Sequence, residues 1–132
     1  MIKNKLKKFL AGALMITSII GTTGVVSAAT TPTDYGTMTY SLRKDSSNKI
    51  IASTSMPANA KPYSYLRTTL EIQINSTGER KSWFSGKAGY VPNIPIGSIL
   101  YSDKGYSCKL AAYSAHEVVG KKGFVKYCST TF

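Results

Sequence analysis

The clearest sign of binding chemistry in the sequence is Trp83, the only tryptophan in the chain. A flat indole ring offers apolar area to a sugar ring or a membrane interface, and cations beside it attract acidic groups. We expect four residues to share its surface: Lys81, Lys87, Tyr65 and Arg67. This set predicts a binding site for an anionic polymer, glycan or lipid. The alternative is that a second sheet or the segment 91–97 covers Trp83 and makes it a core residue.

Residues for catalysis are scarce. His116 is the only histidine, and its neighbour Glu117 points to the opposite face if both lie on a strand, so the two cannot form a local dyad. No third ligand stands at metal spacing from the histidine and the cysteines, and residues 86–89 lack the pattern of a phosphate-binding loop. We therefore predict no enzymatic activity, no metal and no cofactor, and expect His116 to be an ordinary strand residue.

Two cysteines, Cys108 and Cys128, form an even pair in a chain predicted to be exported. A disulfide is the expected state in an oxidising space, and its loop of about 20 residues would stabilise the fold by roughly 3 kcal/mol. Two free thiols are the alternative. A hairpin turning at residues 120–123, with Glu117 opposite Lys126, would set Cys128 against Ala115. Cys108 is therefore expected in a bend or on another neighbouring strand.

The N-terminal segment reads as a secretory signal peptide. Lysines at positions 3, 5, 7 and 8 precede an apolar stretch at 9–20, which is too short to span a bilayer, and Val26-Ser27-Ala28 offers a cleavage site. We predict a signal peptide at 1–28 and one secreted domain at 29–132, with no transmembrane segment after cleavage; an uncleaved anchor is the alternative. The mature domain has 104 residues and a net charge of +7, against +11 for the full chain. This charge favours anionic partners, although it indicates no specific nucleic-acid recognition.

In the segments that position these residues, apolar side chains occur at every second residue. Residues 63–74 alternate apolar and polar side chains, which is typical of one long, half-buried strand. Similar alternation at 37–42 and 49–56, together with strands at 98–102, 107–119 and 124–131 and a partner for the long strand, gives about seven strands. The sequence predicts an all-β fold, a small antiparallel β-sandwich or barrel.

For one hairpin, the residue-by-residue pairing of the two strands can be predicted. A three-residue loop at 76–78 with Gly78 in the left-handed region sets Asn75 opposite Glu79. Leu70 then faces Phe84, and the apolar side chains of both strands share one face. Trp83 comes to lie opposite Glu71 on the other face, with the four expected site residues.

Three functional classes remain open. The first is a secreted, non-enzymatic, envelope-associated binding protein of a Gram-positive bacterium, which recognises an anionic surface or glycan through a cationic aromatic sheet face. The second is a cationic, antimicrobial, bacteriocin-like toxin. The third is a small secreted hydrolase, which the missing catalytic residues disfavour, or an enzyme inhibitor.

Overall fold

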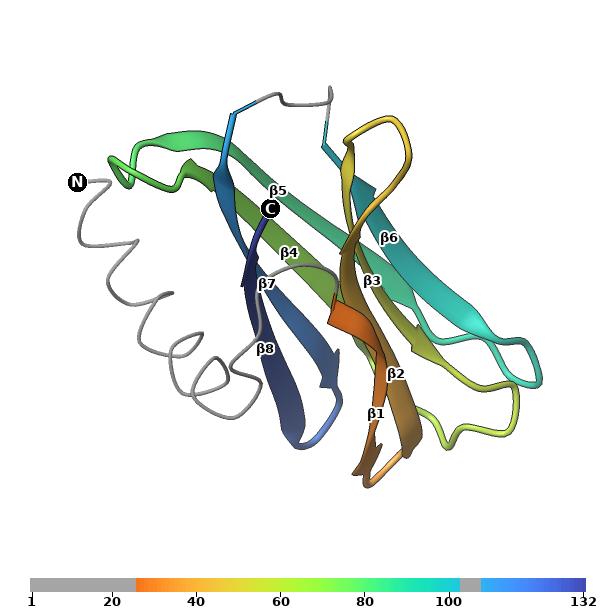
Figure 1. Cartoon of the computed structure of the whole chain (residues 1–132). Helices are drawn as coiled ribbons and strands as arrows, with labels where there is room; N and C mark the ends of the chain where they lie inside the picture. Colours follow the sequence, from red (N-terminus) through yellow and green to blue (C-terminus); the bar gives the residue numbers. More distant parts are fainter. Residues whose placement is uncertain (1–25, 103–107) are drawn as a thin grey trace.

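The computed structural model describes residues 26–102 and 108–132, which form eight antiparallel strands and no helix (Figure 1). The strands are β1 (Val26–Thr33), β2 (Gly36–Lys44), β3 (Ile50–Met56), β4 (Tyr65–Ile74), β5 (Arg80–Gly89), β6 (Ile96–Tyr101), β7 (Leu110–Val119) and β8 (Gly123–Thr131). The predicted all-β class is confirmed.

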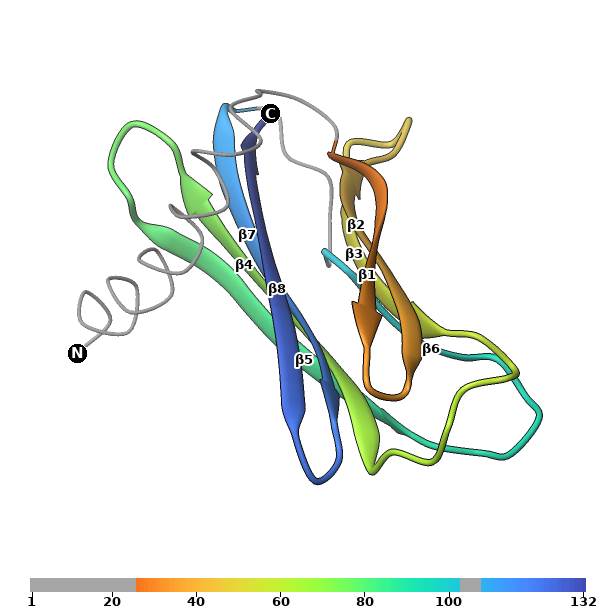
Figure 2. The same ribbon diagram turned by 90° about the horizontal axis from the view of Figure 1, so that it is seen from below.

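The strands form two four-stranded sheets that pack face to face, as the two views in Figures 1 and 2 show. One sheet has the order β1-β2-β3-β6 and the other the order β5-β4-β7-β8. The two sheets make a sandwich and do not close into a barrel. Because each sheet has one face toward the other, its strands alternate between buried and more exposed side chains.

Strand β1 is one strand more than the sequence predicted. Its residues are mostly Thr and Ala, with Pro32 near the end, so they lack the apolar alternation that marks the other strands. The pairing of β1 with β2 is regular from Ala29 onward and irregular between Val26 and Ala29.

Most of the predicted signal peptide, residues 1–25, lies outside the described residues. Among the described residues, no helix is long and apolar enough to span a membrane.

The interior consists of two apolar clusters, one toward each end of the sandwich. One contains Leu42, Ile50, Ala52, Leu70, Ile72, Leu110, Ala112 and Cys128, and the other contains Tyr35, Met38, Met56, Ala60, Tyr63, Leu66 and Val118. Both draw residues from both sheets, so their burial holds the sheets together. A buried polar layer of Thr54, Thr68, Ser114 and His116 lies between them.

The predicted β4–β5 register is confirmed over most of its length. Leu70 pairs with Phe84, and Glu71 pairs with Trp83. The turn itself differs from the prediction, because the loop begins one residue earlier and has four residues, 75–78, and the Ile74 amide donates to the Glu79 carbonyl at 2.9 Å. Gly78 does adopt a left-handed conformation, with φ of 72°. A register shift between Ile72 and Gln73 then restores the predicted pairing.

The predicted β7–β8 register is wrong by one residue. Val119 pairs with Gly123 across a three-residue turn, so Glu117 lies opposite Val125 and Cys128 lies opposite Ser114. The shift keeps Phe124 and Cys128 on the inner face of the sheet, with Val118 and Ser114, where the two apolar clusters need them.

The predicted disulfide is not formed. Cys128 is fully buried on β8, whereas Cys108 is exposed in a bend before β7, and both are free thiols. Burial raises the pKa of the Cys128 thiol to about 11. The expectation that Cys108 sits in a bend is confirmed, and the strand predicted from 107 begins at Leu110. A thiol inside the core and one on the surface cannot meet without moving a strand.

Candidate functional site

Trp83 lies on the outer face of the β5-β4-β7-β8 sheet and is 51% exposed. It projects from β5 opposite Glu71, as the hairpin register predicted. The alternative that Trp83 belongs to the core is therefore wrong, because neither the second sheet nor the segment 91–97 covers it. A ring this large and this exposed is available for stacking against a ligand.

Three of the predicted site residues form a compact group on the same face as Trp83, farther along the β4–β5 hairpin. The Lys87 ammonium lies 4.8 Å from the centre of the Tyr65 ring, and the Arg67 guanidinium carbon lies 5.3 Å from it. Arg67 also donates a hydrogen bond to the Tyr65 hydroxyl at 3.3 Å and lies 3.9 Å from a carboxylate oxygen of Glu117. Two cations that face each other across β4 and β5 thus approach the same ring.

Lys81 is exposed on β5, in the same alternation as Trp83 and Lys87, and it lies at a bulge of the strand. The register shift in β5 leaves Lys81 without a cross-strand partner and pairs Arg80 with Gln73 instead. The Lys81 ammonium lies 3.3 Å from the Glu79 carboxylate, at the turn. The bulge adds Arg80 to the outer face, because Arg80 pairs with Gln73 and its guanidinium contacts Glu71 there.

Arg80 contributes to a polar cluster centred on Glu71. Its guanidinium lies 3.1 Å from one carboxylate oxygen of Glu71, and the Gln73 amide donates to the other oxygen at 3.0 Å. Glu71 is only 1% exposed, and burial raises its pKa although the Gln73 and Arg80 contacts oppose the rise. The Nε of Arg80 is buried without a hydrogen-bond partner. The cluster places a buried carboxylate beneath the exposed side chains of the outer face, Trp83 among them.

Two tyrosines extend this group of side chains across the sheet. Glu71 pairs with Tyr113 of β7 on the side away from Trp83, and Tyr127 of β8 lies on the same face opposite Ala115, two residues from the partner of Tyr113. Both rings are partly exposed. Burial, together with the charge of Glu71, raises the pKa of the Tyr113 hydroxyl. Sequence reasoning missed both tyrosines because the pairing of β4 with β7 joins segments far apart in the chain.

The outer face is aromatic more than it is cationic. The side chains of this face and of the adjoining turn include four cations and three carboxylates: Arg67, Arg80, Lys81 and Lys87 against Glu71, Glu79 and Glu117. Lys87 is the one cation of the four for which the structure shows no carboxylate partner. The face thus attracts an anion at one end and offers ring surfaces along the rest.

His116 lies on the opposite, inner face of the same sheet and has no exposed surface. Its Nδ1 is 2.8 Å from the Thr54 hydroxyl and its Nε2 is 2.7 Å from the Ser114 hydroxyl. The Thr54 and Thr68 hydroxyl oxygens lie 2.7 Å apart, and Thr68 donates to the Ser98 carbonyl at 2.8 Å. These bonds connect the two sheets. Burial lowers the pKa of His116 to about 3, so the ring is neutral. Its expected placement on a strand is confirmed.

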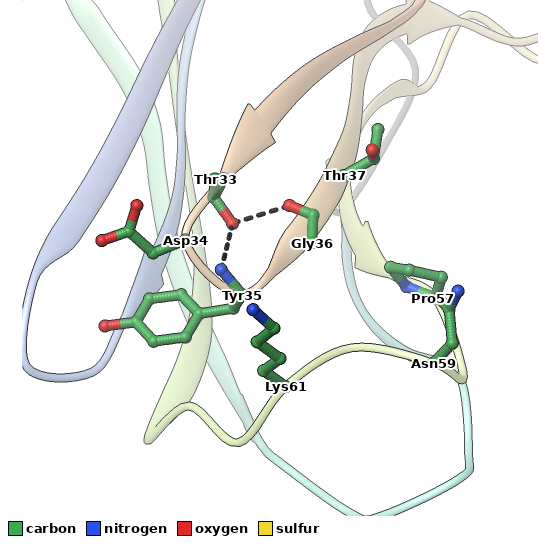
Figure 3. Close-up of a pocket in the computed structure, with 8 residues that line it drawn as sticks. All are labelled: Thr33, Asp34, Tyr35, Gly36, Thr37, Pro57, Asn59 and Lys61. Atoms are coloured by element: carbon green, nitrogen blue, oxygen red, sulfur yellow. Dashed lines mark hydrogen bonds between the residues drawn. The ribbon is translucent and has the colours of Figure 1, made fainter.

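A separate pocket of about 460 Å³ lies at the end of the sandwich, between the β1–β2 turn and the chain after β3 (Figure 3). It is lined by Thr33, Asp34, Tyr35, Gly36, Thr37, Pro57, Asn59 and Lys61. The Thr33 hydroxyl donates to the Gly36 carbonyl and accepts from the Tyr35 amide, as the dashed lines in Figure 3 show. These bonds stabilise the β1–β2 turn, which forms one wall of the pocket.

The described residues contain no group of three or more His, Cys, Asp or Glu side chains that could hold a metal ion. Comparison with protein-family models, with curated proteins and with solved structures finds no match to this chain. The function must therefore be inferred from the outer face of the β5-β4-β7-β8 sheet.

Proposed function

We propose that this chain is a secreted, non-enzymatic binding protein of a Gram-positive bacterial envelope, and that it recognises an anionic glycan or wall polymer. The site is the outer face of the β5-β4-β7-β8 sheet, defined by Trp83, Tyr65, Arg67, Lys87 and Tyr113. The observation that carries the proposal is the exposure of Trp83, at 51%, on the same sheet face as a tyrosine ring that two cations approach.

Each part of the face suits one part of such a ligand. The Trp83 ring gives an apolar platform for the face of a sugar, and Lys87 offers its ammonium to an acidic substituent. Trp83 and Lys87 are four residues apart on one strand, a separation of about 13 Å. A ligand that contacts both must be longer than a single sugar ring. We therefore expect a polymer to bind more tightly than its monomer.

The net charge acts at longer range than the face does. The site is almost neutral overall, whereas the domain after the predicted cleavage site carries +7. Attraction of an anionic polymer thus comes from the domain as a whole and weakens as salt screens it, while contact with Trp83 provides the short-range recognition.

Retention on immobilised polymers tests the proposal. Purified protein is applied to an acidic bacterial wall polymer and to an uncharged polysaccharide at low salt, and each is then washed with increasing salt. We expect retention on the acidic polymer that falls as salt rises, and weaker retention on the neutral one. Passage through the acidic polymer at low salt would contradict the proposal.

A parallel assay with acidic liposomes separates wall-polymer binding from membrane activity. The proposal expects no release of a trapped dye at protein concentrations that saturate the wall polymer. Dye release at those concentrations would instead favour the toxin-like class, because a protein that only binds the surface leaves the bilayer intact.

A further inference from the structure

Strand β6 (Ile96–Tyr101) is an edge strand without the residues that usually protect an edge. Edge strands of soluble proteins are commonly guarded by lysine or proline. The three other edge strands of the sandwich carry such residues: Pro32 in β1, Lys126 in β8 and Lys81 and Lys87 in β5. Strand β6 has the sequence Ile-Gly-Ser-Ile-Leu-Tyr, with no charge and no proline.

The backbone groups of β6 that point away from its neighbour can be assigned from the pairing with β3. The Ser102 amide, just after the strand, donates to the Ile50 carbonyl of β3 at 2.9 Å. In an antiparallel pair the N–H and C=O of a residue point to the same side, and this side alternates along the strand. The odd-numbered residues Gly97, Ile99 and Tyr101 therefore direct their backbone groups away from β3.

The same three residues form the exposed face of the strand. Ile99 is 54% exposed and Tyr101 is 53% exposed, whereas Ser98 is buried and Leu100 packs against the core. Backbone groups that no described strand pairs with and exposed apolar side chains thus occur at the same positions of β6. This combination is what a strand needs in order to add another strand at its edge.

We propose that β6 pairs with β6 of a second copy of this chain, antiparallel and centred on Ile99. In this register Ile99 lies opposite its own counterpart, and Tyr101 lies opposite Gly97 of the second copy. Each of the three outward residues exchanges two hydrogen bonds with its partner. The Tyr101 ring covers the bare backbone of the opposing glycine, an arrangement known to stabilise glycines in sheets.

The partner is a second copy of the chain because the exposed edge of β6 is complementary to itself. A register centred on Ile99 places apolar against apolar, and the large ring against the smallest residue, twice by symmetry. The two β1-β2-β3-β6 sheets become one continuous sheet, so both β5-β4-β7-β8 sheets lie on the same side of it. Both Trp83 faces then point the same way. Because one short strand buries little area, we expect a concentration-dependent equilibrium and not a permanent dimer.

Cysteine cross-linking tests the register directly. Ile99→Cys and Tyr101→Cys are each made in a Cys108→Ser background, because Cys108 is the exposed native thiol. The two Cα atoms at position 99 would be about 5.5 Å apart, within disulfide range. Those at position 101 would be displaced by about 13 Å along the strands. Mild oxidation should give a covalent dimer of the first variant and leave the second monomeric.

Sedimentation over a concentration series provides the independent measurement. The parent protein should shift from monomer to dimer, and Ile99→Lys should remain monomeric because it places two ammonium groups opposite each other. Val125→Lys is the matched control, since Val125 is an exposed apolar residue on the β8 edge. A parent protein that stays monomeric up to about 1 mM, the range of very weak association, would overturn the proposal. Equal cross-linking at positions 99 and 101 would also overturn it.

Discussion

His116 places a titratable ring between the sheets, with hydroxyl groups at both nitrogens. Its pKa in the folded chain is about 3, whereas an unfolded histidine titrates near about 6.5. Between these values the unfolded chain binds more protons, so the free energy of unfolding is highest above about pH 6.5 and falls as pH drops toward 3. We expect His116 to cost about 1 kcal/mol of stability per pH unit in that window. Urea unfolding at a series of pH values measures the slope.

His116→Gln is the control for this slope, because glutamine does not titrate. Burial raises the pKa of Glu71, which acts in the opposite direction, since protonation of a raised carboxyl favours the folded chain as pH falls. The difference between parent and variant removes this contribution and leaves that of His116. Stability curves that stay parallel from pH 7 to pH 4 would show that His116 is not buried as a neutral ring.

The two thiols should differ sharply in reactivity. Cys108 is exposed, whereas Cys128 is fully buried and burial raises its pKa to about 11, so little thiolate forms there at neutral pH. A thiol reagent should label one cysteine rapidly in the folded protein and both after denaturation. Detection of no thiol under non-reducing denaturation would mean that the disulfide forms after all.

At the scale of elements, Tyr35 ties the β1–β2 turn to the β7–β8 turn of the other sheet. Its hydroxyl donates to the Lys122 carbonyl at 2.9 Å and accepts from the Lys122 amide at 3.0 Å. A Cβ added to Gly120 would lie 2.7 Å from the Tyr35 Cζ, so the ring could not stay in place. We expect Gly120→Ala to lower the free energy of unfolding by about 2 kcal/mol.

The neighbouring turn glycine offers a matched control for that substitution. A Cβ at Gly123 would meet nothing within 4 Å, so Gly123→Ala should leave the urea midpoint nearly unchanged. Equal midpoints for the two alanine variants would contradict the contact between Tyr35 and Gly120 as the link between the sheets.

How well an element can be predicted from this sequence depends on how local its determinants are. The β4–β5 register follows from the alternation in β4 and from Gly78, which are close in sequence, and it is confirmed. The β7–β8 turn offers two glycines and two lysines as possible turn residues, and the core settles the choice by requiring Cys128 to face inward. Strand β1 has almost no apolar pattern and exists because β2 offers it a free edge.

The candidate site shows the same limit. Trp83, Tyr65, Arg67 and Lys87 lie on one hairpin, so their shared face could be predicted from the strand period. The bulge that brings Arg80 onto the face depends on the turn conformation. Tyr113 and Tyr127 reach the face only through the pairing of β4 with β7 and of β7 with β8, which no local pattern encodes.

For the molecule as a whole, the positive charge is spread over the ends of the sandwich more than over the aromatic face. Lys49 and Lys109 lie beside turns at one end, and Lys61, Lys121 and Lys122 lie in turns at the other. The outer face of the β5-β4-β7-β8 sheet is aromatic and nearly neutral by comparison. Charge should therefore govern the rate at which the protein associates with an anionic polymer and the salt dependence of that rate. Trp83 should govern the affinity of the bound state.

The most direct test of this account is the equilibrium affinity of Trp83→Ala for an acidic wall polymer, measured at fixed ionic strength together with its urea midpoint. Because the ring is exposed and its stacking is lost, affinity should fall about 3- to 10-fold with the midpoint unchanged. Val125→Ala, an exposed apolar change on the same sheet, should alter neither quantity. An affinity of Trp83→Ala equal to that of the parent protein would contradict the assignment of this face as the binding site.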